Sequence, residues 1–71
     1  MNAAQKIRKA MLGIMEEGEV NASQVYKSNG YDGFGWYFCK FGSTATYIGK
    51  SLTDTLQWLE EAAKIRQEYN Y

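Results

Sequence analysis

The sequence predicts a small α+β domain in which a helix, a three-stranded antiparallel meander and a second helix follow one another. Two observations favour this order. Apolar residues recur at helical spacing near both ends of the chain, whereas residues 23–50 alternate in strand fashion and are rich in glycine and aromatic side chains. Because the strands are consecutive, the economical arrangement packs both helices on one face of the sheet. We therefore expect a single αβββα domain over residues 1–71.

A first amphipathic helix is predicted over residues 2–17, with Asn2 as the N-cap and Gly18 as the stop. Its apolar face holds Ala3, Ala4, Ile7, Ala10, Met11, Ile14 and Met15. The charges run against the helix dipole, because basic side chains fall in the first half and Glu16 and Glu17 lie at the end. Either packing outweighs this small electrostatic cost, or these charges are placed for a partner.

Three strands are predicted over residues 24–27, 36–41 and 44–48. Residues 28–35 form a glycine-rich loop, in which Asn29-Gly30 is a good two-residue turn. Gly42-Ser43 is a type II′ turn candidate between the second and third strands.

The Gly42-Ser43 turn sets the expected register of the last two strands. It pairs Phe41 with Thr44, Cys39 with Thr46, Phe38 with Tyr47, Tyr37 with Ile48 and Trp36 with Gly49. One face then carries Tyr37, Cys39, Phe41, Thr44, Thr46 and Ile48, and the other carries Trp36, Phe38, Lys40, Ala45 and Tyr47. Both faces are apolar, but two helices cover only one of them. Some aromatic surface should remain exposed, and such patches mark interaction sites.

The second helix should begin near Ser51 or Thr53 and end near Glu68. Its apolar residues form two stripes of identical spacing, about 130° apart at 3.6 residues per turn. The first holds Leu52, Leu56, Leu59 and Ala63; the second holds Trp58, Ala62, Ile65 and Tyr69. We expect one stripe to pack on the sheet and the other on the first helix.

Composition argues against an enzyme or a metalloprotein. The chain has no histidine and one cysteine, so the Ser–His and Cys–His pairs and the zinc ligand sets are excluded. Cys39 lies within a predicted strand and is typical of a small buried hydrophobe. The glycines of residues 30–35 lack the spacing of a phosphate-binding loop. We expect no catalytic residues, no cofactor and no metal.

Eight basic and eight acidic side chains give a formal net charge of zero. This balance favours neither a polycation nor a mimic of DNA. A lone cysteine fits a cytoplasmic protein, and the apolar runs are too short to span a membrane.

These features predict a protein-interaction module, an adaptor or an inhibitor of a larger protein machine, that forms a homodimer. The contact would use the aromatic sheet face and the edge strand 44–48. Its candidate residues are Trp36, Phe38, Lys40, Tyr47 and Tyr26. If the helices cover that face, the set becomes Tyr37, Phe41 and Thr46. Trp58 and Tyr69 are secondary candidates if their stripe faces outward.

The alternative is a weak nucleic-acid-binding domain. Lys27, Lys40 and Lys50 fall in the sheet region against Asp32 alone, and aromatic side chains among lysines can stack on bases. Three lysines neutralise few phosphates, so binding at physiological salt would be weak.

Overall fold

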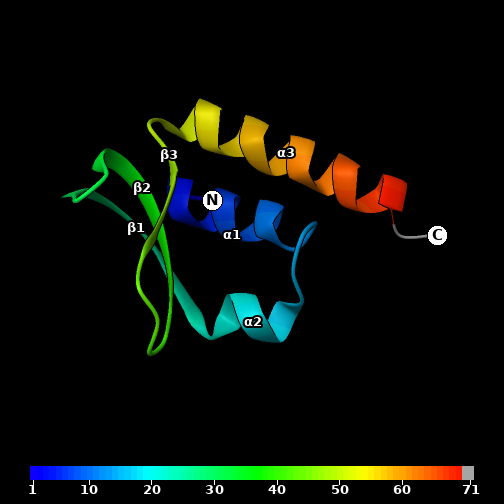
Figure 1. Ribbon diagram of the computed structural model, residues 1–71, viewed down its shortest axis with the longest axis horizontal. Coiled ribbons are helices and arrows are strands. Elements are labelled where there is room, and N and C mark those ends of the chain that lie inside the picture. The colour runs from blue at the N-terminus through cyan, green and yellow to red at the C-terminus, as the bar shows by residue number, and fades with distance from the viewer. Residues whose placement is uncertain (70–71) are drawn as a thin grey trace.

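The structure, a computed structural model that describes residues 1–69, has the predicted order of elements with one additional short helix (Figure 1). The elements are α1 (Ala3–Met11), α2 (Glu17–Asn21), β1 (Ser23–Gly30), β2 (Gly33–Lys40), β3 (Thr46–Gly49) and α3 (Leu52–Tyr69). The strands form one antiparallel sheet in the order β1-β2-β3. The predicted α+β meander is therefore confirmed.

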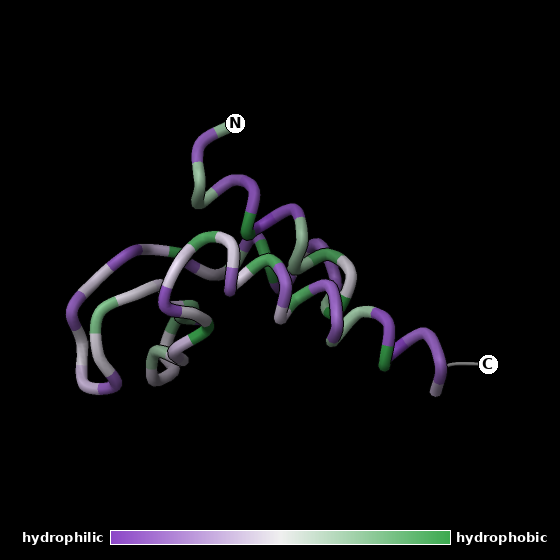
Figure 2. The backbone as a smooth tube through the Cα atoms, turned by 90° about the horizontal axis from the view of Figure 1, so that it is seen from above, coloured by the Kyte–Doolittle hydropathy of each residue, from purple (hydrophilic) through white to green (hydrophobic). Residues whose placement is uncertain are grey.

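Helices α1 and α3 lie side by side on the same side of the sheet, as expected (Figures 1 and 2). The core lies between these layers. The buried cluster draws on both helices, α2 and two strands: Ile7, Met11, Val20, Trp36, Phe38, Ile48 and Leu59. Because Trp36 and Phe38 belong to this cluster, the helices cover the sheet face that carries them.

The single helix expected over residues 2–17 is wrong, because α1 ends at Met11 and α2 begins at Glu17, after five intervening residues. Gly13 lies in the intervening turn, where a Cβ atom would come within 3.0 Å of the Ala63 Cβ atom on α3. Glycine is a poor helix former, and here it also allows the chain to approach α3 closely.

The break resolves the charge pattern that opposed the dipole of a single helix. Arg8 and Lys9 fall in the last turn of α1, and Glu17 and Glu19 fall in the first turn of α2. Each pair lies at the end that the helix dipole favours. With two separate helices the charges are favourably placed, so no electrostatic cost remains for packing to outweigh.

Asn2 is the N-cap of α1, as predicted. Its side chain accepts a hydrogen bond from the Gln5 backbone N–H at 2.8 Å, and the Gln5 side chain accepts one from Asn2 at 2.9 Å. The two residues form a capping box that satisfies two free donors at the helix start.

The loop predicted over residues 28–35 is also wrong, because β1 and β2 extend into it and leave Tyr31-Asp32 as the two-residue connection. Gly33 adopts a φ of 115°, which side chains other than glycine rarely adopt. The turn geometry therefore rests on Gly33 rather than on Asn29-Gly30.

The β2–β3 connection is longer than the predicted turn. Ser43 donates its backbone N–H to the Lys40 carbonyl at 3.0 Å, with Gly42 at the third position of this turn and a φ of 80°. A positive φ there is the requirement of a type II turn, so the predicted II′ assignment is wrong. The next strand starts only at Thr46.

A bulge at Ile48 changes the predicted register of β3. Trp36 is opposite Gly49, as predicted, but Tyr37 pairs with Tyr47 and Phe38 pairs with Thr46. The predicted partners of Tyr37 and Phe38 are therefore wrong by one residue. A one-residue shift exchanges the two faces of a strand, so Tyr47 joins Tyr37, and Ile48 joins the core.

Candidate functional site

The sheet face opposite the helices carries one tyrosine from each strand. Tyr26, Tyr37 and Tyr47 are neighbours in the register, and we call this row the tyrosine face. Its position follows from strand alternation, since Trp36 and Phe38 on either side of Tyr37 point into the core. The Ile48 bulge completes the row, because it places Tyr47 on this side.

The three rings pack against one another. Tyr26 and Tyr37 are stacked, with ring centroids 5.9 Å apart and an interplanar angle of 15°. Tyr37 and Tyr47 meet edge to face at 5.3 Å and 69°. Both arrangements are favourable aromatic geometries, so the row is held in place before any partner arrives.

Two glycines of the hairpin make room for these rings. The Tyr37 hydroxyl donates a hydrogen bond to the Gly33 carbonyl at 2.5 Å, and a Cβ atom on Gly30 would lie 2.8 Å from that hydroxyl. Tyr47 lies over Gly35 in the same way. Rings that cover bare backbone stabilise strand glycines, which accounts for the glycine-rich sequence here.

A groove of about 280 Å³ adjoins the tyrosine face. It is bounded by the β1–β2 hairpin and by the β2–β3 connection, and its lining comprises Tyr26, Ser28, Gly30, Tyr31, Asp32, Tyr37, Thr44 and Ala45. Tyr31 is fully exposed at the hairpin tip. Among the described residues that line the groove, Asp32 alone carries a charge.

The structure separates the residues that we predicted as the main contact set. Tyr26, 37% exposed, and Tyr47 belong to the tyrosine face. Trp36 and Phe38 are 8% and 9% exposed and pack beneath the helices, so their predicted exposure is wrong. Because the helices cover this face, the alternative contact set of Tyr37, Phe41 and Thr46 applies.

Of that alternative set, Tyr37 lies at the centre of the tyrosine face but is only 4% exposed. Phe41 is 76% exposed in the turn after β2, and Thr46 is exposed opposite Phe38. These two side chains are accessible, but neither lines the groove.

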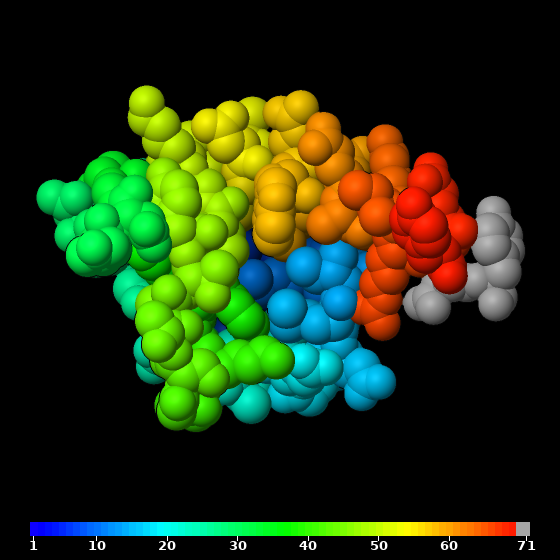
Figure 3. All heavy atoms as spheres, in the orientation of Figure 1, coloured from blue at the N-terminus to red at the C-terminus, as the bar shows by residue number. Residues whose placement is uncertain are grey.

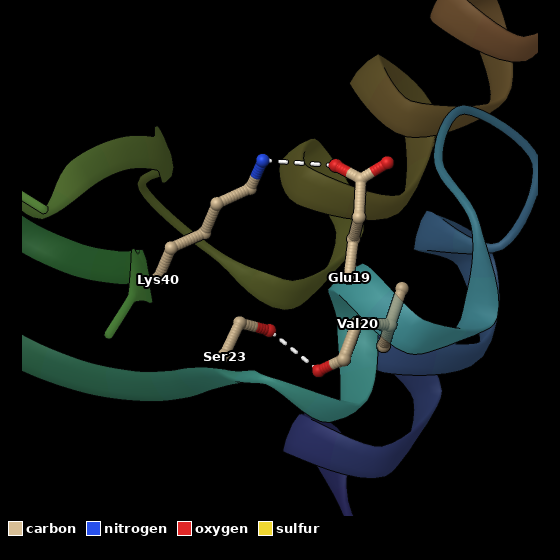
Figure 4. A network of polar contacts seen from close by, with 4 residues as sticks. All are labelled: Glu19, Val20, Ser23 and Lys40. Atoms are coloured by element: carbon tan, nitrogen blue, oxygen red, sulfur yellow. Dashed lines mark hydrogen bonds and ion pairs between the residues drawn. The ribbon is translucent and has the colours of Figure 1, made fainter. Parts of the chain in front are cut away.

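Lys40 contacts α2 instead of the tyrosine face. Its ammonium group lies 2.9 Å from a carboxylate oxygen of Glu19, and this pair joins the end of β2 to α2 (Figure 4). The hydrogen bond from Lys40, reinforced by its charge, lowers the pKa of Glu19 below its ordinary value of 4.5. Beside it, the Ser23 hydroxyl donates to the Val20 carbonyl at 2.6 Å. Lys40 therefore forms a half-exposed ion pair between two elements of the fold and is not part of the groove.

Lys27 also lies away from the groove. Its ammonium group is 5.1 Å from the ring centroid of Phe34 and 6.0 Å from that of Trp36. Cation–π contacts at such distances hold a lysine against its own protein surface. Of the three lysines expected among the aromatic rings, Lys27 and Lys40 thus contact Phe34 and Glu19 rather than the groove.

A second exposed apolar surface lies on α3. Leu59 and Thr55 are buried toward the core, whereas Trp58, Ile65 and Tyr69 are 50%, 56% and 84% exposed. We call these three residues the α3 stripe. The prediction that this stripe packs on the first helix is wrong, and the outward orientation required of Trp58 and Tyr69 as secondary candidates is present.

Tyr31 and Asp32 belong to the groove but are not among the residues predicted from the sequence. The predicted loop over residues 28–35 encloses both of them, whereas they form the exposed tip of a hairpin. The glycines on either side of this tip, Gly30 and Gly33, could have indicated its position in the sequence. Asn29-Gly30 matches a common two-residue turn more closely, and it placed the turn two residues too early.

No family model, curated protein or solved structure matches this chain. Within residues 1–69, no helix has the length and apolar character needed to cross a bilayer. The same residues contain no cluster of three or more His, Cys, Asp or Glu side chains that fits a metal ion.

Proposed function

We propose that this protein is a non-enzymatic protein-interaction module that contacts its partner through the tyrosine face and the adjoining groove. The observation that carries the proposal is the internally packed tyrosine row, which no helix covers and in which Tyr26 is exposed, beside a groove of about 280 Å³. Tyrosine is enriched at protein interfaces because a large ring with few rotatable bonds gives much contact area at low entropic cost.

The size of the groove fits this role. Pockets for small molecules and cofactors usually measure about 300–1,000 Å³. The groove is slightly below that range and is bounded mainly by exposed side chains. It suits one or two side chains of a protein partner, with the flanking rings providing the surrounding contact.

The partner class includes a second copy of the chain, as well as a larger protein that the domain would adapt or inhibit. Within residues 1–69, β1 and β3 each pair with β2 alone. Their outer edges can therefore extend a sheet across a two-fold axis, which would place two tyrosine faces in one continuous layer.

Nucleic acid is the weaker alternative. Lys27 and Lys40 contact Phe34 and Glu19 rather than the groove, and the charge within the groove lining is that of Asp32. A carboxylate beside the stacking rings repels phosphate. Titration with labelled oligonucleotides at about 150 mM salt should give Kd values above about 100 μM, the range of non-specific binding.

The test uses the full chain as bait and three alanine variants. Tyr26→Ala and Tyr31→Ala remove exposed rings at the groove, and Tyr69→Ala, the matched control, removes an exposed ring from α3. For a partner recovered from the native source and then purified, we expect the groove variants to weaken binding at least tenfold, a typical hot-spot loss. For a partner bound at the tyrosine face, Tyr69→Ala should leave that affinity unchanged, whereas a partner lost in Tyr69→Ala alone binds at α3.

The same three variants should be examined by sedimentation velocity. A dimer that dissociates in the groove variants but not in Tyr69→Ala would identify the second copy as the partner. If every recovered partner binds the groove variants as tightly as the wild type, then the tyrosine face is not the contact surface.

A further inference from the structure

The α3 stripe has the spacing of a helix-pairing seam. Together with the half-buried Ala62, the three residues of the stripe (Trp58, Ile65 and Tyr69) follow one another at intervals of four, three and four residues, the spacing of coiled-coil a and d positions. The helix has 18 residues, which corresponds to a length of about 27 Å. It runs along one edge of the molecule, and its last turn projects beyond α1 (Figures 1 and 3).

An acidic row borders this stripe. Asp54, Glu61 and Glu68 recur every seven residues and are all exposed. At about 100° per residue, they lie roughly 60° from the centre of the stripe, where coiled coils place the charges that select a partner. Row and stripe therefore form one surface, apolar along its centre and negative along one border.

Among residues 1–69, no basic side chain forms an ion pair with a carboxylate of this row. The ion pairs within 4.0 Å in this part of the chain are Lys40–Glu19 and Lys64–Glu60. Arg66 lies on the opposite border of the stripe, and its charge acts on Glu19 of α2. The negative border is thus available to a partner.

We infer that α3 is a docking surface for an amphipathic helix of another protein, in which lysine or arginine residues repeat beside an apolar stripe. This surface is distinct from the tyrosine face, and its test is independent of the function proposed above. A basic row on the partner would face Asp54, Glu61 and Glu68, while its apolar side chains would cover Trp58, Ile65 and Tyr69.

The charges favour this occupant over two others. A second copy of α3 brings three carboxylates of its own and only Arg66 as a cation beside the stripe. Two antiparallel copies would place the acidic rows against each other. An anionic membrane surface is likewise repelled by this row, whereas helices that bind such surfaces are basic on their polar side.

The test measures fluorescence anisotropy of two fluorescein-labelled three-heptad peptides titrated with the full-length protein. Both carry leucine at the a and d positions; one has lysine at e and g, and the other has glutamate. We expect the lysine peptide to bind at least tenfold more tightly, and its affinity to fall as salt is raised.

Point variants locate the contact. Ile65→Ser, at a half-exposed position, should weaken the lysine peptide at least tenfold. Glu61→Gln should weaken it several-fold. Glu60→Gln is the matched control, because Glu60 lies off the stripe and pairs with Lys64, and it should have no effect. Tyr26→Ala should also have none, because Tyr26 lies on the sheet.

Several results would overturn this inference. Equal binding of the two peptides, binding of neither, or binding unaffected by Ile65→Ser would each reject a basic helix as the occupant. A wild-type dimer that Ile65→Ser dissociates would identify the second copy instead. Co-sedimentation of the protein with vesicles of anionic phosphatidylglycerol, lost in Ile65→Ser, would identify a lipid surface.

Discussion

Gly49 marks the place where β3 meets α3, and its missing side chain is what lets the two elements touch. A Cβ atom there would overlap the Thr55 hydroxyl oxygen and lie 2.9 Å from the Thr55 Cα atom on the helix. The helix backbone cannot yield as a flexible side chain would. This single position therefore controls how closely the last helix approaches the sheet.

We predict that Gly49→Ala lowers the free energy of unfolding by about 1–3 kcal/mol, the usual cost of overpacking. Gly18→Ala is the matched control, because Gly18 lies in α2, where an added Cβ atom would have nothing within 4 Å of it. That change should instead stabilise by about 0.5–1 kcal/mol, since alanine is the better helix former. Urea unfolding of both variants measures the difference, and a neutral Gly49→Ala would contradict the close contact.

The Glu19–Lys40 ion pair gives the protein one defined pH response. Since the pKa of Glu19 is lowered in the folded state, its contribution to stability is present above its ordinary value of 4.5 and is lost as the pH falls through the lowered value. In Lys40→Met we expect the pKa of Glu19 to rise toward 4.5, as measured by NMR titration of its side-chain carboxyl carbon. Lys64→Met should leave Glu19 unchanged, because Lys64 pairs with Glu60.

At the scale of elements, one arginine joins three segments of the chain. The Arg8 guanidinium group on α1 donates to the Val20 carbonyl at 3.0 Å and to the Ser23 carbonyl at 2.9 Å. It thereby satisfies acceptors where α2 ends and β1 begins, and it places a positive charge at the C-terminal end of α2. Position and orientation of the short helix both depend on this contact.

We predict that Arg8→Lys lowers the free energy of unfolding by about 1–2 kcal/mol, because a lysine cannot reproduce two parallel hydrogen bonds from one planar group. Lys9→Ala, an exposed neighbour in the same helical turn, should change it by less than about 0.5 kcal/mol. Both values follow from urea midpoints. Equal effects of the two changes would show that Arg8 acts only as a surface charge.

The order and type of the elements could be predicted from the sequence because hydrophobic period is a local property. Helical spacing at both ends and strand alternation between them were sufficient. The break between α1 and α2 was also visible, in Gly13 and in the reversed charges, but strong packing of one long helix could have outweighed both signals. The charges were the better indication, because basic residues mark the end of α1 and acidic residues mark the start of α2.

The register of β3 could not be predicted, since it depends on tertiary contacts. Gly42 is compatible with a two-residue turn and with the longer connection that the structure has. The choice is made by Ile48, which enters the core and forms a bulge between the Trp36–Gly49 and Tyr37–Tyr47 pairs. That choice decided the candidate site, because it moved Tyr47 to the face of Tyr37.

The outward direction of the α3 stripe has a similar origin. Both stripes of the helix have the same spacing in the sequence, so periodicity alone does not say which is buried. The stripe that holds Leu59 packs on both the sheet and α1, and its last member, Ala63, lies against Gly13 in the turn after α1. Because neither neighbour reaches the other stripe, Trp58, Ile65 and Tyr69 remain exposed.

At the scale of the whole molecule, one fully buried leucine belongs to the core that the helices and the sheet share. Leu59 is fully buried in the cluster shared by α1, α2, the sheet and α3. We predict that Leu59→Ala costs about 2–5 kcal/mol and lowers the urea midpoint equally by circular dichroism and by tryptophan fluorescence. Leu12→Ala, at a position 48% exposed, should cost much less. Separate midpoints for the two probes would argue against one cooperative unit.

The two tryptophans of the chain occupy opposite environments, one sealed inside and the other at the solvent boundary. Their intrinsic emission therefore carries two separate signals. Acrylamide should quench the emission of the exposed Trp58 in the folded protein, whereas the emission of the buried Trp36 should be quenched only after unfolding. Without any added label, the emission of Trp58 would report the helix docking inferred for α3, and the emission of Trp36 would report unfolding.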